Sequence, residues 1–144
     1  MSTESQKPPY RGALPKPTPE TQAFWDAAKA HKLVLPWCQD CGRPHFYPRS
    51  LCPHCLSRSL EWRQASGRGT LYSYVINHKP AKGFDTVPYA IGVVALAEGP
   101  RMLSNIVTAG EPTPENLKID MELDVFFDDV TDTISLPKFR PVAS

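Results

Sequence analysis

The chain has 144 residues, of which 41% are hydrophobic and 22% charged, values that suit one compact domain or a small module joined to a modest second one. No stretch approaches the roughly 20 consecutive apolar residues that a membrane span requires, and the N-terminal residues lack the apolar region of a secretory signal. We therefore expect a cytoplasmic protein without a membrane partner, in which paired cysteines bind metal before they form disulfides.

Charge is divided unevenly along the chain. Residues 1–68 carry ten Lys and Arg against five Asp and Glu, a balance of +5, whereas residues 69–144 carry six against ten, a balance of −4. The formal net charge is +1 and the isoelectric point is about 7.7. A dedicated nucleic-acid-binding domain is expected to have an isoelectric point above about 9, so the overall charge disfavours that class.

The N-terminal region predicts an arm followed by a helix. Residues 1–18 are rich in proline and poor in apolar side chains, which is typical of an extended segment. The sequence T-P-E at 18–20 supplies a hydroxyl cap, a first-turn proline and an acid, so we predict a helix over residues 19–32. Its large aromatic residues, Phe24 and Trp25, pack either on the body of this chain or on a partner protein, as part of the interface.

All four cysteines lie in two C-x-x-C pairs separated by ten residues. Each pair places two sulfur atoms of a tight turn near one ion, and four thiolates complete the tetrahedral shell of Zn²⁺. Such a closed site leaves no position for substrate, so we predict one structural zinc ion in a ribbon over residues 33–66. Iron also accepts four thiolates and is the less favoured ion, and two disulfides would require an oxidising compartment. The predicted ligands are Cys38, Cys41, Cys52 and Cys55.

Two histidines lie close to these cysteines in the sequence. His45 and His54 are not needed as ligands, because four sulfur atoms already fill the shell. We expect them at the surface or in support of the ligands.

The sequence after a Gly-Arg-Gly turn at 67–69 favours β structure. Five segments are rich in β-branched and aromatic residues, and several of them alternate polar with apolar residues. A longer link, in which prolines limit any helix to a short one, separates the third segment from the fourth. This pattern predicts a five-stranded OB-type barrel over residues 67–144, in a mainly β fold with an N-terminal helix and a four-cysteine zinc ribbon. The predicted strands cover residues 70–78, 89–97, 101–107, 122–130 and 133–139.

Sequence motifs of common active sites are absent from the chain. It has no G-x-S-x-G, H-E-x-x-H, P-loop or G-x-G-x-x-G motif, and its cysteines are all assigned to metal. His31 and His78 are single histidines, which are more often structural or solvated than catalytic, and the acids at 128–132 lie at a predicted hairpin, where they serve turns. We therefore expect that the chain is not an enzyme by itself.

The order of helix, ribbon and barrel resembles the zinc-ribbon/OB-fold family first catalogued as a domain of unknown function, DUF35. The segments G-R-G-T-L-Y-S-Y (67–74) and L-P-K-F-R-P (136–141) make the resemblance specific, and it covers nearly the whole chain. It implies a small accessory partner of thiolase-superfamily enzymes, including aldolases that act on steroid side chains. It also implies a structural ribbon and a barrel that meets acyl-CoA or the catalytic subunit.

Three functional hypotheses follow. The first is a non-catalytic subunit that binds a thiolase-like enzyme and helps form its acyl-CoA channel, with cations and an apolar slot for CoA. The residues predicted to contact acyl-CoA are Lys79, Lys82, Phe84, Tyr89, Arg101, Lys138 and Arg140.

The second hypothesis is nucleic-acid binding, in which Tyr72, Tyr74 and Phe84 stack on bases. The balance of −4 over the barrel disfavours it, because acids repel a phosphate backbone. The third is an adaptor whose helix and arm bind a protein without any small molecule.

Overall fold

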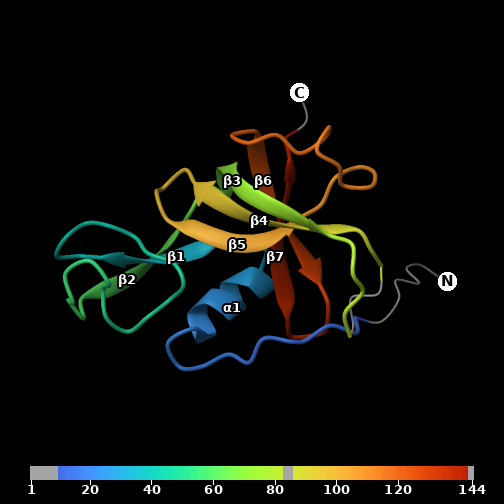
Figure 1. Cartoon of the computed structure of the whole chain (residues 1–144). Coiled ribbons are helices and arrows are strands. Elements are labelled where there is room, and N and C mark those ends of the chain that lie inside the picture. Colours follow the sequence, from blue (N-terminus) through green and yellow to red (C-terminus); the bar gives the residue numbers. More distant parts are fainter. Residues whose placement is uncertain (1–9, 83–85, 143–144) are drawn as a thin grey trace.

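The computed structural model describes residues 10–82 and 86–142 (Figure 1). A helix, a two-stranded ribbon and a closed five-stranded barrel follow one another along the chain, which confirms the predicted mainly β fold class. The ribbon projects from one side of the barrel, and the helix lies between ribbon and barrel in this view. Within the described ranges, no helix has the length and hydropathy needed to cross a bilayer.

Helix α1 (Gln22–Lys29) is shorter than predicted at both ends. A turn precedes it, in which the backbone N–H of Thr21 donates to the carbonyl of Thr18 at 3.0 Å. After the helix, His31 adopts a φ of 62°, a left-handed conformation that cannot continue the helix. The hydrogen-bonded turn and the left-handed residue together restrict the helix to its central two turns.

The helix lays its aromatic face on the body of the chain. Phe24 and Trp25 are 2% and 8% exposed and belong to the main hydrophobic core. Their rings meet edge to face with centroids 4.9 Å apart. Of the two alternatives predicted for these residues, the structure favours packing on the body of this chain over a partner interface, because α1 contacts strands of both the ribbon and the barrel and both side chains are buried.

The ribbon consists of two antiparallel strands, β1 (Val34–Cys38) and β2 (Leu60–Gln64). Cys38 faces Leu60 in the register, so the strands end where the first cysteine pair begins. Near the barrel, Leu33 and Leu35 are 2% and 0% exposed and belong to the same core as α1. The base of the ribbon is thus continuous with the barrel core, whereas the cysteines lie at its far end.

All five predicted barrel strands are present, and their bounds differ from the predicted ones by at most two residues. They close in the order β3-β4-β5-β7-β6, with β3 also paired to β6. The β5–β7 pairing is parallel and is recorded at one position, Ile106 with Phe139, whereas the other pairings are antiparallel. No helix forms in the link 107–121. The strands are β3 (Arg68–Asn77), β4 (Tyr89–Leu96), β5 (Arg101–Ile106), β6 (Glu122–Asp129) and β7 (Ser135–Pro141).

Alternation along the strands separates a packed interior from an outer face. Along β4 every second residue, from Ala90 to Leu96, is buried, as expected for a strand with one face on a core. Gly92 is one of them, and a Cβ at that position would lie 2.6 Å from Cγ1 of Ile106. The barrel interior is therefore packed closely enough there to require glycine.

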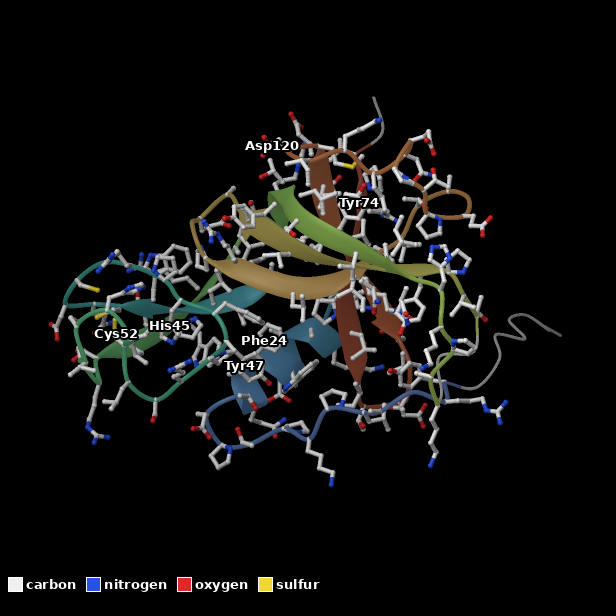
Figure 2. The ribbon with its side chains drawn as sticks, in the orientation of Figure 1. Phe24, His45, Tyr47, Cys52, Tyr74 and Asp120 are labelled. Carbon is white, nitrogen blue, oxygen red and sulfur yellow. The ribbon has the colours of Figure 1, made fainter. Side chains whose placement is uncertain are left out.

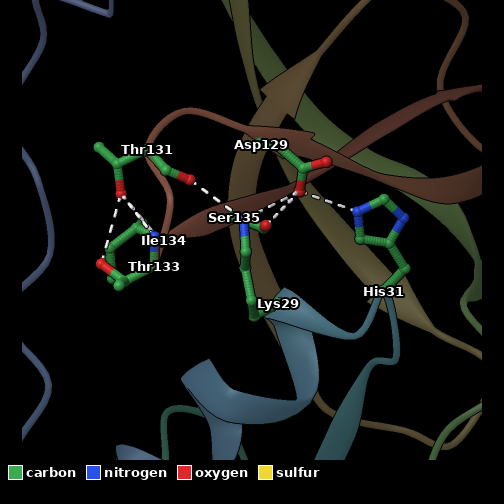
Figure 3. Close-up of polar contacts among 7 residues, drawn as sticks. All are labelled: Lys29, His31, Asp129, Thr131, Thr133, Ile134 and Ser135. Carbon is green, nitrogen blue, oxygen red and sulfur yellow. Dashed lines mark hydrogen bonds and ion pairs between the residues drawn. The ribbon is translucent and has the colours of Figure 1, made fainter.

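A polar cluster fastens α1 to the hairpin between β6 and β7 (Figure 3). His31 Nε2 lies 2.8 Å from Asp129 Oδ1, and the Ser135 hydroxyl donates to the same oxygen. Lys29 Nζ donates to the carbonyl of Thr131 at 3.1 Å. The hydrogen bonds from Ser135 and His31 lower the pKa of Asp129. Asp129 therefore does more than stabilise its own hairpin: it links that hairpin to the end of the helix, about a hundred residues earlier in the chain.

Candidate metal centre and candidate ligand cavity

The four cysteine thiols converge at the far end of the ribbon. Their Sγ atoms all lie within 4.8 Å of one another, with 3.6 Å between Cys38 and Cys55 and 3.7 Å between Cys41 and Cys52. Four sulfur atoms held tetrahedrally at about 2.3 Å from Zn²⁺ would be about 3.8 Å apart. The arrangement fits one tetrahedral metal ion, as the two C-x-x-C spacings predict.

Backbone groups of the two turns prepare these thiols for metal. The Cys41 N–H donates to Cys38 Sγ at 3.4 Å, and this hydrogen bond is the largest of several interactions that together lower the pKa of Cys38 to about 6. The Ser57 backbone lowers the pKa of Cys55, but desolvation and the three neighbouring thiols outweigh it and raise that pKa to about 12. Cys38 thus ionises readily, whereas Cys55 favours its neutral form, and a bound divalent cation would stabilise the Cys55 thiolate.

The two ribbon histidines occupy different environments. His54 is exposed, as expected, but His45 is only 4% exposed, and Figure 2 shows it between Cys52 and Phe24 in projection. Burial and the neighbouring His54 lower the pKa of His45. The Arg49 backbone lies beside the ring, but neither ring nitrogen has a hydrogen bond of good geometry within the described chain. The expectation that His45 lies at the surface is therefore wrong, because the side chain is buried.

A cavity of about 340 Å³ opens on the barrel where β4, β5 and β7 meet. Tyr89 and Lys138, which the sequence predicts as acyl-CoA contacts, both line it. Tyr10 of the N-terminal arm also lines it, and burial raises the pKa of its hydroxyl, with a smaller effect from Asp128. The described part of the arm, which begins at Tyr10, thus reaches the barrel surface, which its composition alone does not indicate.

The remaining predicted contacts do not join Tyr89 and Lys138 at this cavity. Lys79 and Lys82 are exposed on the loop between β3 and β4 and are not among its lining residues. Arg140 places its guanidinium 5.0 Å from the centre of the Phe126 ring. Phe84 lies outside the described residues. The six predicted acyl-CoA contacts that the structure describes therefore do not form a single site.

Arg101 lies at a different part of the barrel. Its guanidinium carbon is 3.9 Å from the centre of the Tyr72 ring, and the residue lines a second cavity, between barrel and ribbon. Tyr72 is thus covered on one face, and Tyr74 packs against the hydrophobic core. These contacts weaken the hypothesis that the two tyrosines stack on bases.

Asn105 and Thr108 also line the first cavity and are absent from the predicted contacts. Asn105 is held by a hydrogen bond from its amide nitrogen to the carbonyl of Ala90 at 3.3 Å. Its position at the end of β5 is the one sequence signal that could have indicated it, because strand ends often carry binding residues. Uncharged polar residues such as these are common throughout a sequence, so residue type alone does not mark them as binding residues.

Two family models match consecutive parts of the chain. Residues 25–61 match the rubredoxin-like zinc ribbon domain of ChsH2, and residues 62–128 match the C-terminal OB-fold domain of ChsH2. The boundary between the matches falls within β2, where the ribbon returns to the barrel.

Curated relatives include subunits and scaffold proteins. A "Probable enoyl-CoA hydratase alpha subunit" of Thermomonospora curvata is 32% identical over 96% of this chain, which spans 43% of that relative's length. A "DUF35 domain-containing scaffold protein" of Pyrococcus furiosus is 30% identical over 88% of this chain and 96% of that protein.

Solved structures agree with these sequence matches. A chain of the structure titled "Ltp2-ChsH2(DUF35) aldolase" has a TM-score of 0.80 and 30% identity, covering 90% of this chain and 100% of that one. A DUF35-family protein of unknown function from Sulfolobus solfataricus has the same fold, with a TM-score of 0.60, 19% identity and coverage of 86% of each chain. The shared arrangement and these identities show that the chain belongs to the DUF35 family of zinc-ribbon and OB-fold proteins.

Proposed function

We propose that this chain is a non-catalytic subunit that binds a thiolase-like enzyme and helps form its acyl-CoA channel. The observation that carries the proposal is the structural match over the entire length of a chain from the Ltp2-ChsH2(DUF35) aldolase. The hydratase-subunit and scaffold names of the relatives support the same role. The four-cysteine centre then holds a structural zinc ion, which supplies folding energy and leaves no open position for chemistry.

An exposed apolar surface on the barrel supports the docking of a protein partner. Val75 of β3 and Leu103 of β5 are 60% and 68% exposed. The register places Val75 beside Ile91, and places Leu103 beside Val93, on strands that neighbour each other. Since contiguous exposed apolar surface commonly marks an interface, this outer face of β3, β4 and β5 is the surface we assign to the catalytic subunit.

Capture of the partner tests the assignment. The tagged full chain, purified from its native cell, should retain a thiolase-superfamily protein in a fixed stoichiometry, identified by mass spectrometry. The double variant Val75→Glu/Leu103→Glu should lose it while staying folded, because two charges on an apolar contact are costly to desolvate. Ile119→Glu is the matched control, since Ile119 is 55% exposed but lies on the link outside the barrel strands.

Retention of the partner by the double variant would place the interface elsewhere, and the absence of a thiolase-like protein would contradict the proposed function. Nuclease-sensitive nucleic acid in its place would favour the nucleic-acid hypothesis.

The first cavity is the proposed contribution to the acyl-CoA channel. Tyr89→Ala in the reconstituted complex should raise the KM for acyl-CoA several-fold, because Tyr89 lines the cavity and a ligand held there would lose apolar contact area. Lys118→Ala, an exposed change on the link, should leave KM unchanged. If Tyr89→Ala left KM as unchanged as Lys118→Ala does, this cavity would not be part of the acyl-CoA channel.

A further inference from the structure

A second cavity lies where the ribbon meets the barrel. It has a volume of about 360 Å³ and is formed by residues 43–46 and 53–54 of the ribbon together with the turn 98–101 between β4 and β5. Figure 1 shows this turn at the side of the barrel from which the ribbon projects. The cavity therefore exists only because the two modules dock on each other.

Buried polar groups without partners line this cavity. Neither ring nitrogen of His45 has a hydrogen bond of good geometry among the described residues, although the Arg49 backbone lies beside the ring. Glu98 Oε1 also has no hydrogen-bond partner there, whereas Glu98 Oε2 accepts a bond of 2.8 Å from the Ser66 N–H. An unsatisfied buried polar group costs about 1–3 kcal/mol, and such groups in native proteins call for an ion, a water or a ligand. The imidazole offers a donor and an acceptor, and the carboxylate offers an acceptor.

Cationic side chains surround the same cavity. Arg43 and Arg101 line it and are exposed, and neither forms an ion pair with a carboxylate among the described residues. Arg101 is stacked on Tyr72, with its guanidinium carbon 3.9 Å from the ring centre. This contact restricts the side chain, so that less conformational entropy is lost when its N–H groups bind an anion. Two arginines against one glutamate leave the lining with a positive balance.

We propose that this junction cavity binds the phosphorylated nucleoside end of a ligand, which, given the proposed function, is that of CoA. Arginine forks match phosphate oxygens in geometry and charge, which assigns the phosphate to Arg43 and Arg101. A nucleoside also carries N–H and hydroxyl donors and ring acceptors, and these would complement the unsatisfied polar atoms of Glu98 and His45. The Glu98 carboxylate repels a bare phosphate ion, whereas a nucleoside presents neutral donors to it, so the nucleotide should bind more tightly than inorganic phosphate.

An amide-resolved titration of the metal-loaded full chain tests this site. Inorganic phosphate, CoA and CoA lacking its 3′-phosphate are added in turn at constant ionic strength. CoA should perturb the backbone amides of the non-proline residues in 43–46 and 98–102 and bind at least tenfold more tightly than phosphate. Weaker binding of the form without the 3′-phosphate would assign that phosphate to the arginines, and equal binding would assign the diphosphate.

The double variant Arg43→Gln/Arg101→Gln should weaken CoA binding at least tenfold. Its matched control is Lys32→Gln/Arg58→Gln, which removes the same charge from exposed positions that do not line the cavity. The control should bind CoA within twofold of the unaltered chain. Both variants replace exposed side chains, and retained amide spectra show that they are folded.

Equal weakening by the two double variants would overturn the site, because it would show attraction by net charge alone. Perturbation confined to Tyr89 and Lys138, or unchanged affinity of the cavity variant in the isolated chain and in the reconstituted complex, would also overturn it. These outcomes leave the subunit proposal intact as long as a thiolase-like partner is captured. Failure to capture that partner contradicts the subunit proposal independently of any CoA titration.

Discussion

The barrel and the outer ribbon differ in what they bury. Leu71, Leu123 and Phe139 of the barrel strands are all 0% exposed. Between residues 39 and 59, all of which the structure describes, the buried residues are His45, Pro48 and Cys52. A segment with so little buried apolar surface cannot offset its own loss of conformational entropy. The barrel is thus held by its core, whereas the outer ribbon depends on its four thiols and the ion they bind.

Removal of the metal should give the largest effect and would test this contrast directly. Binding of zinc to sites of this kind contributes about 10–16 kcal/mol, so a strong chelator should abolish amide-exchange protection over residues 39–59. The barrel strands should keep theirs, because their core contains no ligand. The measurement is hydrogen exchange followed by mass spectrometry or NMR, with metal content verified.

Cys52→Ser should reproduce the effect of chelator, and Ser50→Ala, an exposed neighbour, should not. Full amide-exchange protection of residues 39–59 after verified loss of metal would show that the outer ribbon does not depend on the ion.

Truncation of a barrel core residue should have the next largest effect. Phe139→Ala removes a side chain with 0% exposure and should lower the free energy of unfolding by about 3–5 kcal/mol, measured by urea denaturation of the metal-loaded chain. Under native conditions the variant should still bind one ion per chain, because the thiols lie in the other module. Val75→Ala, at 60% exposure, is the control and should change stability by less than about 0.5 kcal/mol. Loss of metal together with the core would show that the two modules fold as one unit.

The contact of Asp129 with His31 should have the smallest effect and is pH-dependent. The folded pKa of Asp129 lies below its usual value, chiefly because of the Ser135 hydroxyl. Its contribution to stability is therefore present above about pH 4 and is lost as the pH falls through the lower folded pKa. The side chain is 50% exposed, so Asp129→Asn should cost at most about 1 kcal/mol at pH 7.

The difference in unfolding free energy between Asp129→Asn and the unaltered chain should shrink toward pH 3. Loss of metal in acid affects both proteins and cancels in that difference. Asp132→Asn, an exposed change in the same hairpin, serves as the control. A difference that is constant from pH 7 to pH 3 would show that the ionised Asp129 does not stabilise the fold.

Features encoded by local spacing could be predicted without the structure. The two C-x-x-C pairs define the metal ligands, since each pair forms its own turn and the sulfur chemistry requires four of them. Alternation and β-branched residues located the five barrel strands, because a strand with one buried face repeats every two residues. The family resemblance came from segments such as L-P-K-F-R-P, and the comparisons confirm it.

Only the tertiary structure decided which surfaces meet. An apolar helix face does not state what covers it, and the docking of α1 on the ribbon base and barrel buried Phe24 and Trp25. Arg101, chosen from sequence with Lys138, lies at another cavity, because residues that end different strands reach different parts of a closed barrel. The junction cavity joins residues near 45 to residues near 100. Such proximity is set by how the two modules pack, and no periodicity in the sequence records it.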